Sequence, residues 1–303
     1  MAISRNQLVK ELEPGLNALF GLEYKQYEQE HAEIYNTESS DRAFEEEVML
    51  SGFAQAQVKP EGSGIAYDSA QETFTARYTH ETIALGFAIT EEAIEDNLYD
   101  RLASRYTKAL ARSMAQTKQV KAAAPLNNGL PGGSFQSGDG VTLFNASHPT
   151  ISGTFSNTLA TAADLNETSL EQAMIDIAAL TDERGLKIAA KAVKMIVPSA
   201  LQFTADRLMN SAQRVGTADN DINAIRNMGM VPGGYVVNHY LTDTDAFFIL
   251  TDLTNTGLKM FQRTGMETSM EPDFSTGNIR YKARERYSFG FSDWRGVYGS
   301  QGA

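Results

Sequence analysis

A long helical stretch decides the fold of this chain: TEEAIEDNLYDRLASRYTKALARSMAQTKQVKAAAP, residues 90–125. Thr90 is a good N-cap, and Pro125 is expected to end the helix. Between them, apolar residues recur every four positions, which predicts one amphipathic helix. These residues are Ile94, Leu98, Leu102, Tyr106, Leu110 and Met114. At about 1.5 Å per residue the rod would be on the order of 50 Å long, which suits a flat or elongated subunit better than a sphere.

The charges of this helix are separated along its length. The acids, Glu91, Glu92, Glu95, Asp96 and Asp100, come first, and the bases, Arg101, Arg105, Lys108, Arg112, Lys118 and Lys121, follow. The helix macrodipole explains the two ends. It does not explain the bases in the middle, because like charges four residues apart repel each other mildly. We therefore expect some bases to meet acids outside the helix, for example Glu45, Glu46 and Glu47 of the same or a neighbouring subunit. Arg101 and Arg105 are candidate contacts between subunits.

The composition excludes several classes of protein. The chain has 303 residues, 42% of them apolar and 21% charged, enough for ordinary cores in two or three domains or in one domain with large insertions. It contains no cysteine, which excludes disulfides, thiolate nucleophiles and cysteine metal sites. No apolar run is long enough to cross a membrane, and no signal peptide is recognisable. The formal net charge of −12 argues against tight binding of nucleic acid.

A long hairpin is predicted before the helix. Residues 50–88 read as two extended stretches around the turn-rich tip KPEGSG. An isolated hairpin is at best marginally stable in water, so this one needs cover from its own domain or from another subunit. Lys59 and Glu61 at the tip are either partners in salt bridges or groups that keep the tip soluble. Upstream, residues 4–35 are helical in character, with a break expected near Pro14 and Gly15.

The rest of the chain predicts an α+β fold without a βαβ repeat. A loop-rich segment, 125–160, precedes a helix with Thr168 as its expected N-cap and Gly185 as its end. Strands are expected at 193–197, 235–238 and 246–250, and a helix ends near residue 211. The final segment alternates bulky and charged residues, which predicts further strands.

No catalytic pattern stands out in the sequence. The four histidines, His31, His80, His148 and His239, form neither an HExxH motif nor an HxH pair. A GxSxG elbow and a Walker A motif are absent. Asp243 and Asp245 resemble a carboxylate pair, but an acidic turn between strands is the preferred interpretation. Together with the outsized hairpin and helix, this favours assembly over catalysis, without a cofactor or a metal.

The order of elements resembles that of the major capsid proteins of tailed bacteriophages, the Hong Kong 97-like fold. Four segments carry the resemblance: RYTHETIALGFAITEEAIEDNLYDRLASRY (77–106), VKMIVPSALQFTADRLM (193–209), VVNHYLTDTDAFFILTD (236–252) and IRYKARERYSFGFSDWRGVYG (279–299). The last two are similar to the C-terminal half of Mu-like head proteins.

The resemblance implies a layout of domains. Residues 1–48 would be the N-terminal arm, 49–88 the E-loop, and 89–125 the part of the peripheral domain with the spine helix. Residues 126–262 would form the axial domain, which in this family packs around five-fold and six-fold axes, and 263–303 would return to the peripheral domain. In the family the E-loop and the N-arm reach over adjacent subunits, which would give the exposed hairpin its cover.

The function implied is self-assembly, as pentamers and hexamers, into an icosahedral shell around double-stranded DNA. The protein would be made in the host cytoplasm and end in the virion. Expected partners are other copies of the chain, a separate scaffolding protein, a portal and a decoration protein, with weak non-specific contact to DNA and no membrane. Some relatives crosslink an E-loop lysine, and Lys59 stands at such a position, but no partner motif is present. The alternatives are an encapsulin-like compartment and a soluble enzyme whose active site the sequence does not reveal.

Overall fold

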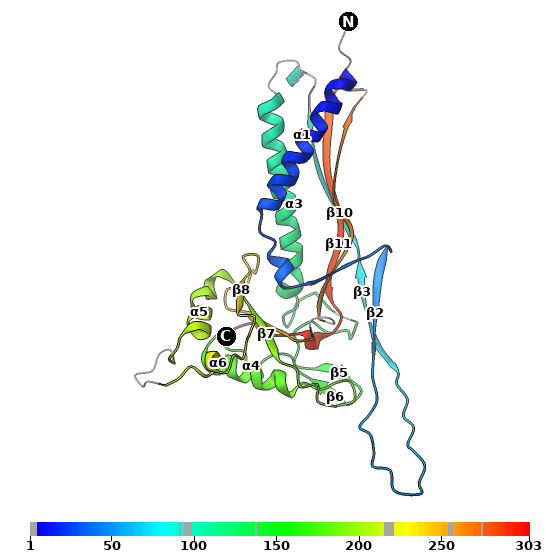
Figure 1. The fold of residues 1–303 in the computed structure, drawn as a ribbon, viewed down its shortest axis with the longest axis vertical. Helices are drawn as coiled ribbons and strands as arrows, with labels where there is room; N and C mark the ends of the chain where they lie inside the picture. Colours follow the sequence, from blue (N-terminus) through cyan, green and yellow to red (C-terminus); the bar gives the residue numbers. More distant parts are fainter. Residues whose placement is uncertain are drawn as a thin grey trace.

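The subunit is elongated, with a narrow upper part, a broader lower part and a projecting hairpin (Figure 1). The computed structural model describes residues 5–303 except 91, 94–98, 137, 215–220, 254–256 and 274; the side chains of 5–13 and 99–102 also lie outside the description. The upper part contains two long helices, α1 (Arg5–Gln26) and α3 (Tyr99–Asn127), beside two long strands. This shape agrees with the flat or elongated subunit that the long helix predicts.

The upper part is built on a four-stranded sheet, which we call the peripheral sheet. Its strands, in spatial order, are β1 (Asn36–Ser39), β10 (Leu258–Pro272), β11 (Ile279–Phe291) and β4 (Glu81–Ile89). β1 runs parallel to β10, and the other neighbours are antiparallel. One face packs against α1 and α3 through a buried cluster that includes Phe20, Met114 and Tyr281. The opposite face carries the exposed side chains of β11, because buried and exposed residues alternate along most of that strand.

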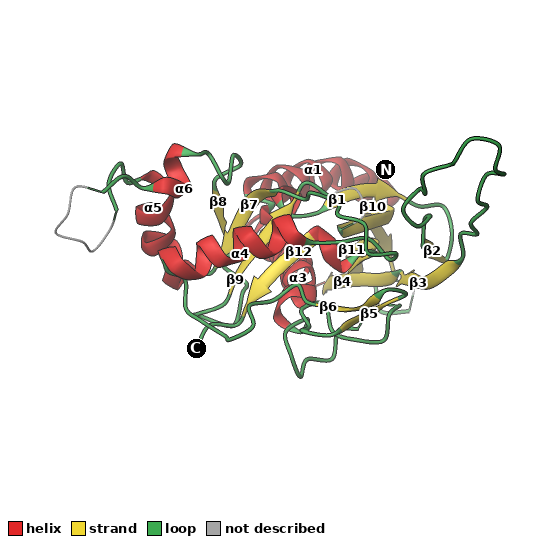
Figure 2. Ribbon diagram, turned by 90° about the horizontal axis from the view of Figure 1, so that it is seen from below, coloured by secondary structure: helices red, strands yellow, loops and turns green. Residues whose placement is uncertain are grey.

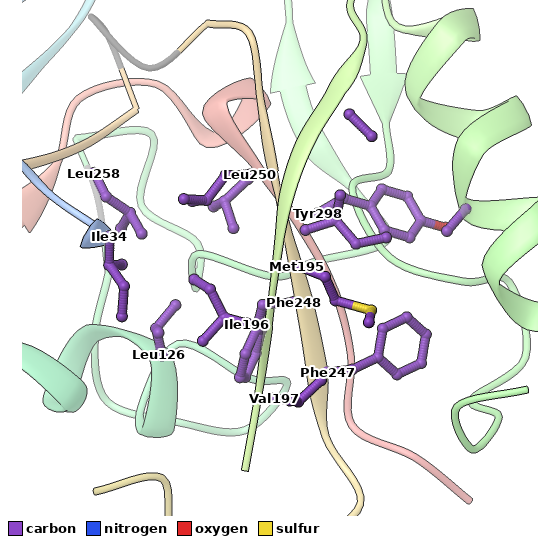
Figure 3. Packing of buried hydrophobic residues seen from close by; sticks show 14 of the residues in the cluster. Ile34, Leu126, Met195, Ile196, Val197, Phe247, Phe248, Leu250, Leu258 and Tyr298 are labelled. Carbon is purple, nitrogen blue, oxygen red and sulfur yellow. The ribbon is translucent and has the colours of Figure 1, made fainter. Parts of the chain in front are cut away.

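The lower part holds a second four-stranded sheet. Its strands are β12 (Val297–Ser300), β9 (Phe247–Thr251), β7 (Ala192–Val197) and β8 (Tyr235–Val237), and its helices are α4 (Glu167–Ala179), α5 (Gln202–Asn210) and α6 (Ala224–Asn227). Met195, Ile196 and Phe248 lie in its core (Figure 3). Leu126 at the end of α3 and Leu258 at the start of β10 belong to the same cluster. This common core therefore extends from the lower part into the adjoining ends of α3 and β10, and it is separate from the cluster between α1, α3 and the peripheral sheet.

The hairpin consists of β2 (Phe44–Leu50) and β3 (Glu72–Thr79), paired antiparallel. Figure 2 shows it on the side of the molecule opposite α5 and α6. Residues 51–71, which we call the excursion, connect the two strands without any strand of their own. The remaining elements are short: β5 (His148–Thr150), β6 (Gly153–Phe155) and the 3₁₀ turns η1 (Glu30–Glu33), η2 (Ser199–Leu201) and η3 (Trp294–Gly296).

Two proline positions differ from the sequence prediction. The long helix does not end at Pro125 but continues to Asn127. The side chain of Leu126 is fully buried in the common core, and this packing holds the last turn in spite of the missing N–H group. Likewise α1 runs through Pro14 without the expected break. Residues 92 and 93 are helical, but most of the predicted acidic half of the long helix, 94–98, lies outside the described residues.

The hairpin and one helix cap also differ from expectation. The paired strands begin at Phe44, and the predicted second arm is divided, because Glu81–Ile89 leaves the hairpin and pairs with β11. In α4 the N-cap is Asn166, not Thr168, and its side chain accepts from the backbone of Ser169. The helix ends at Ala179, well before Gly185. The predicted strands at 193–197, 235–238 and 246–250 are confirmed within one residue at each end.

Candidate assembly surfaces

Three bases of α3 meet acids outside the helix, in their own subunit. Lys108 lies 3.6 Å from Glu23 on α1. The Nζ atom of Lys118 lies 3.1 Å from a carboxylate oxygen of Glu285 on β11, and that of Lys121 lies 2.6 Å from a carboxylate oxygen of Glu81 on β4. The helix is therefore fixed by charge to α1 on one side and to the peripheral sheet on the other.

Arg105 differs from these bases. Its side chain is exposed, and among the described residues it has no ion pair. The side chain of Arg101, the second predicted contact, lies outside the described residues. Arg105 is thus available to a neighbouring copy, and its contact between subunits stays a prediction.

Glu45, Glu46 and Glu47 do not reach α3 within their own subunit. Glu45 lies 3.9 Å from Arg42, and Glu46 lies 3.6 Å from Arg77. Glu47 accepts from Lys259 and from Ser292. The expectation that these acids meet the helix bases is therefore wrong within the subunit, because the three side chains are used at the root of the hairpin. A contact with a neighbouring copy stays a prediction.

A buried lysine organises this root. The Nζ atom of Lys259 contacts Glu47 and lies 3.1 Å from Glu38, and only 7% of its side chain is exposed. Burial alone would lower the pKa of Lys259, but the hydrogen bonds to Glu47 and Glu38 outweigh it and raise that pKa. The lysine therefore stays charged and joins the start of the hairpin to β1 and β10.

Aromatic packing fixes the returning strand of the hairpin. The Tyr78 ring packs edge-on against the Phe261 ring, with 4.8 Å between the ring centroids. The Tyr78 hydroxyl oxygen lies 2.5 Å from the Ser292 hydroxyl oxygen. Gly290 is required beneath it, since a Cβ there would lie 2.7 Å from the Tyr78 ring. The direction in which the hairpin leaves the body is thus determined by close packing.

The excursion, in contrast, exposes apolar side chains. Val58 is 94% exposed and Tyr67 is 89% exposed, and Phe53 and Ile65 are exposed by more than half. Few hydrogen bonds hold the excursion together. Among them, the Ala54 N–H donates to the Asp68 carboxylate, and the Ser63 N–H donates to the carbonyl of Pro60. A soluble monomer rarely presents apolar groups so openly, so the excursion has the properties of a surface that another molecule covers.

Lys59 and Glu61 lie at the tip of the excursion, as predicted from the sequence. Both are exposed, and neither forms an ion pair with any residue that the structure describes. The lower part of the subunit reaches the excursion through Arg184, which donates to the Ser69 carbonyl at 2.6 Å and lies 3.9 Å from Asp68. Arg184 and Lys259 were missed by sequence reasoning, since nothing near either residue signals so distant a partner.

The remaining candidate residues have structural partners. His31, His80 and His148 are buried, and His239 contacts Glu30. Asp243 accepts the backbone N–H of Asp245 at 3.0 Å, as in a tight turn. Within the described ranges, no cluster of three or more His, Asp or Glu residues is arranged to hold a metal ion. The described helices also include none that is long and apolar enough to span a membrane.

Solved structures with this arrangement are viral and particle shells. The capsid of Myoviridae phage XM1 matches with a TM-score of 0.56 and 12% identity, over 89% of both chains. A chain of the structure described as Mycobacterium phage Che8 matches with a TM-score of 0.51 and 15% identity, over 90% of this chain and 92% of that one. A virus-like particle from Pyrococcus furiosus matches with a TM-score of 0.52 and 8% identity, over 94% and 97%. The fold is therefore the Hong Kong 97-like fold, with an N-arm, an E-loop hairpin, a spine helix, and peripheral and axial domains.

The family follows from the sequence. The family model described as phage capsid protein matches residues 72–300, and the chain belongs to this family. It is a shell-forming head protein, and its place is the virion. The search of curated proteins gives no match. The finer resemblance of the C-terminal half to Mu-like head proteins stays a prediction.

Proposed function

We propose that this chain is the major capsid protein of a tailed phage, and that its copies close as pentamers and hexamers into an icosahedral shell around double-stranded DNA. The observation that carries this proposal is the exposure of apolar side chains along the excursion. Its apolar side chains, such as Val58 and Tyr67, are open to water in the single subunit. In a shell, the neighbouring copy would cover them, and their burial would contribute to assembly.

The layout of the subunit supports specific roles for its parts. The excursion and the N-terminal arm would lie over adjacent copies, and the lower part, with α5 and α6, would form the axial contacts. We propose domain boundaries near 1–48, 49–88, 89–125, 126–262 and 263–303, with two corrections: β4 pairs within the peripheral sheet and not within the E-loop, and β12 pairs within the sheet of the lower part. Each contact can be weak, because heterologous contacts repeated around closed axes add up over the shell.

The charge balance supports a container and not a tight DNA binder. With a formal net charge of −12, the chain neutralises few phosphates, and electrostatic affinity for DNA depends on their number. Packaged DNA would therefore be confined with weak, non-specific contact. A scaffolding protein, a portal and a decoration protein would complete the head, and synthesis would take place in the host cytoplasm.

Co-expression with a scaffolding protein tests the proposal. Electron microscopy of the product should show closed particles of uniform size, built from this chain. A strictly monomeric product, under conditions in which related shells form, would contradict it.

A second candidate is a protein compartment of the encapsulin type, because the virus-like particle from Pyrococcus furiosus shares the fold. The content of particles purified from the natural source distinguishes the two. Nuclease-protected double-stranded DNA supports the phage head, whereas a packaged enzyme supports the compartment.

A further inference from the structure

One residue of the lower part holds the excursion against the body of its own subunit. Residues 51–71 contain no strand, and they extend past the lower part (Figure 1). Among the described residues, only Arg184 joins the excursion to the lower part by hydrogen bond or ion pair. Its Nη2 atom donates to the Ser69 carbonyl at 2.6 Å and lies 3.9 Å from a carboxylate oxygen of Asp68. The direction of the excursion therefore depends on two anchors, the root at β2 and β3 and this contact.

The turn that carries Arg184 is itself firmly anchored. The Asp182 carboxylate accepts the backbone N–H groups of Arg184 and Leu186, at 2.9 and 2.8 Å. The neighbouring Glu183 side chain turns inward, where it is 3% exposed and lies 2.9 Å from Arg295. Moving the turn would break this buried pair and leave its charges uncompensated, which is strongly unfavourable. Arg184 is therefore presented to the excursion from a fixed point.

The contact with Asp68 reaches both limbs of the excursion. One carboxylate oxygen of Asp68 accepts the N–H of Ala54, on the limb that leaves β2, at 2.8 Å. The other accepts the N–H of Ser69, on the limb that returns to β3, also at 2.8 Å. These two bonds lower the pKa of Asp68, so the carboxylate stays ionised and attracts Arg184. Arg184, Asp68 and Ala54 thus form a chain of contacts across the excursion.

The strength of this contact is limited. The Nε atom of Arg184 is buried and has no hydrogen-bond partner among the described residues, and an unpaired buried N–H group is unfavourable. The Asp68 side chain is 40% exposed, so solvent weakens the attraction between the two charges. Removing the contact should therefore change the behaviour of the excursion several-fold and should leave the fold of the subunit intact.

We propose that Arg184 is a clamp that fixes the direction of the excursion in the free subunit, before a neighbouring copy is met. Without the clamp, the two limbs would take many directions, and a neighbour would have to order them on contact. That ordering weakens association, whereas a segment held beforehand in one direction avoids the loss. The consequence for assembly rests on the proposed shell, but the clamp itself belongs to the single subunit.

Hydrogen exchange of the free subunit, at a concentration too low for particles, tests the clamp directly. Arg184→Met keeps an unbranched side chain and removes the charge and all donors. The amides of Ala54 and Ser69 should then exchange about threefold faster or more, while those of β2 and β3 should be unchanged. Arg207→Met is the matched control, because exposed Arg207 bonds to its own helix. Unchanged exchange at Ala54 and Ser69, with faster exchange only in the turn at 181–187, would overturn the clamp.

Spin labels give an independent readout. The chain has no cysteine, so Val58→Cys near the tip and Ala178→Cys on α4 introduce the only thiols, both at exposed positions. The distribution of distances between the two labels should be narrow with Arg184 present and wider with Arg184→Met. Arg184→Lys should be intermediate, because lysine keeps the charge without the planar set of donors. Equal widths in the three chains would contradict the proposal.

Assembly with the scaffolding protein tests the consequence. Arg184→Met should raise the concentration at which particles first form by about threefold to tenfold, whereas Arg207→Met should leave it unchanged. If the wild-type chain forms no particles, the proposed function fails, and the measurements on the free subunit still decide on the clamp. If those measurements show the clamp and Arg184→Met assembles normally, the clamp stands and its role in assembly is wrong.

Discussion

Lys118 of α3 and Glu285 of β11 form a buried ion pair that joins the spine helix to the peripheral sheet. Their charged atoms lie 3.1 Å apart, with 8% and 1% of the side chains exposed. The Tyr24 hydroxyl donates to the same carboxylate at 2.6 Å. Burial and the charge of Glu285 raise the pKa of Tyr24, so the phenol keeps its proton. Helix α1, helix α3 and the sheet thus meet at a single carboxylate.

Lys118→Met should destabilise the subunit strongly, because it leaves the Glu285 carboxylate buried without its counter-charge. We expect a loss of about 3 kcal/mol or more in the free energy of unfolding, measured by urea denaturation. The double variant Lys118→Met, Glu285→Leu should recover most of this loss, because it removes both buried charges. Equal losses in the single and double variants would contradict the pairing.

Acid should weaken the fold through His31. Burial, with a smaller effect from Lys118, lowers the pKa of this histidine from 6.5 to about 4. Because the folded pKa is the lower one, the stabilisation is complete above pH 6.5 and is lost as the pH falls towards 4. The loss should reach about 3 kcal/mol at pH 4. Urea denaturation between pH 7 and 4 should show a shallower pH dependence for His31→Gln. His80, whose burial also lowers its pKa, accounts for a remaining slope; identical slopes would contradict this prediction.

Reversing the charge of Arg105 should impair assembly more than folding. The side chain is exposed and has no ion pair in the described part of its own subunit, so Arg105→Glu should shift the melting temperature by no more than about 2 °C. The yield of particles should nevertheless fall, as measured by sedimentation. Lys108→Glu is the matched control, since its pair with Glu23 is internal and its loss should cost about 0.5 kcal/mol of stability. Normal particle yield with Arg105→Glu would mean that this base is only solvated.

Gly290→Ala should disturb the root of the hairpin. The added Cβ would lie 2.7 Å from the Tyr78 ring, so the ring and its contact with Ser292 must shift, at a cost of roughly 1–3 kcal/mol. Thermal unfolding and particle yield should both decrease. Gly265→Ala on β10 is the control, because the nearest atom to its Cβ is a side-chain nitrogen at 3.5 Å. An equal effect of the two variants would argue against a role for packing at Tyr78.

The sequence predicts most of the elements, because strong periodicity marks them. The three apolar runs that become β7, β8 and β9 lie close to their expected positions. The ends of elements are less predictable, since they depend on distant contacts. Pro125 fails to end α3 because Leu126 is buried in a core made mainly by later residues. The boundary between β3 and β4 depends on the pairing of β4 with β11. No local sequence pattern predicts this distant pairing.

The partners of the helix bases show the same limit. The charge separation correctly indicates that some bases meet acids outside the helix, but not which acids. One signal was present at Glu285, the only charged residue in the inward register of β11, between Ala283 and Tyr287. A lone acid in an otherwise apolar register is expected to be buried and paired. Arg184 and Lys259 lack any comparable signal.

The order of strands in the peripheral sheet has a consequence for the timing of assembly. β1 pairs with β10, and β4 pairs with β11. The two strands that the ribosome makes first therefore cannot pair until the other two have been made, near the end of synthesis. Until then the spine helix has no sheet to lie on, and the hairpin lacks Lys259, Gly290 and Ser292 at its root. A nascent chain therefore cannot present a finished docking surface to its neighbours, and the topology itself delays nucleation of particles until the late strands have been made.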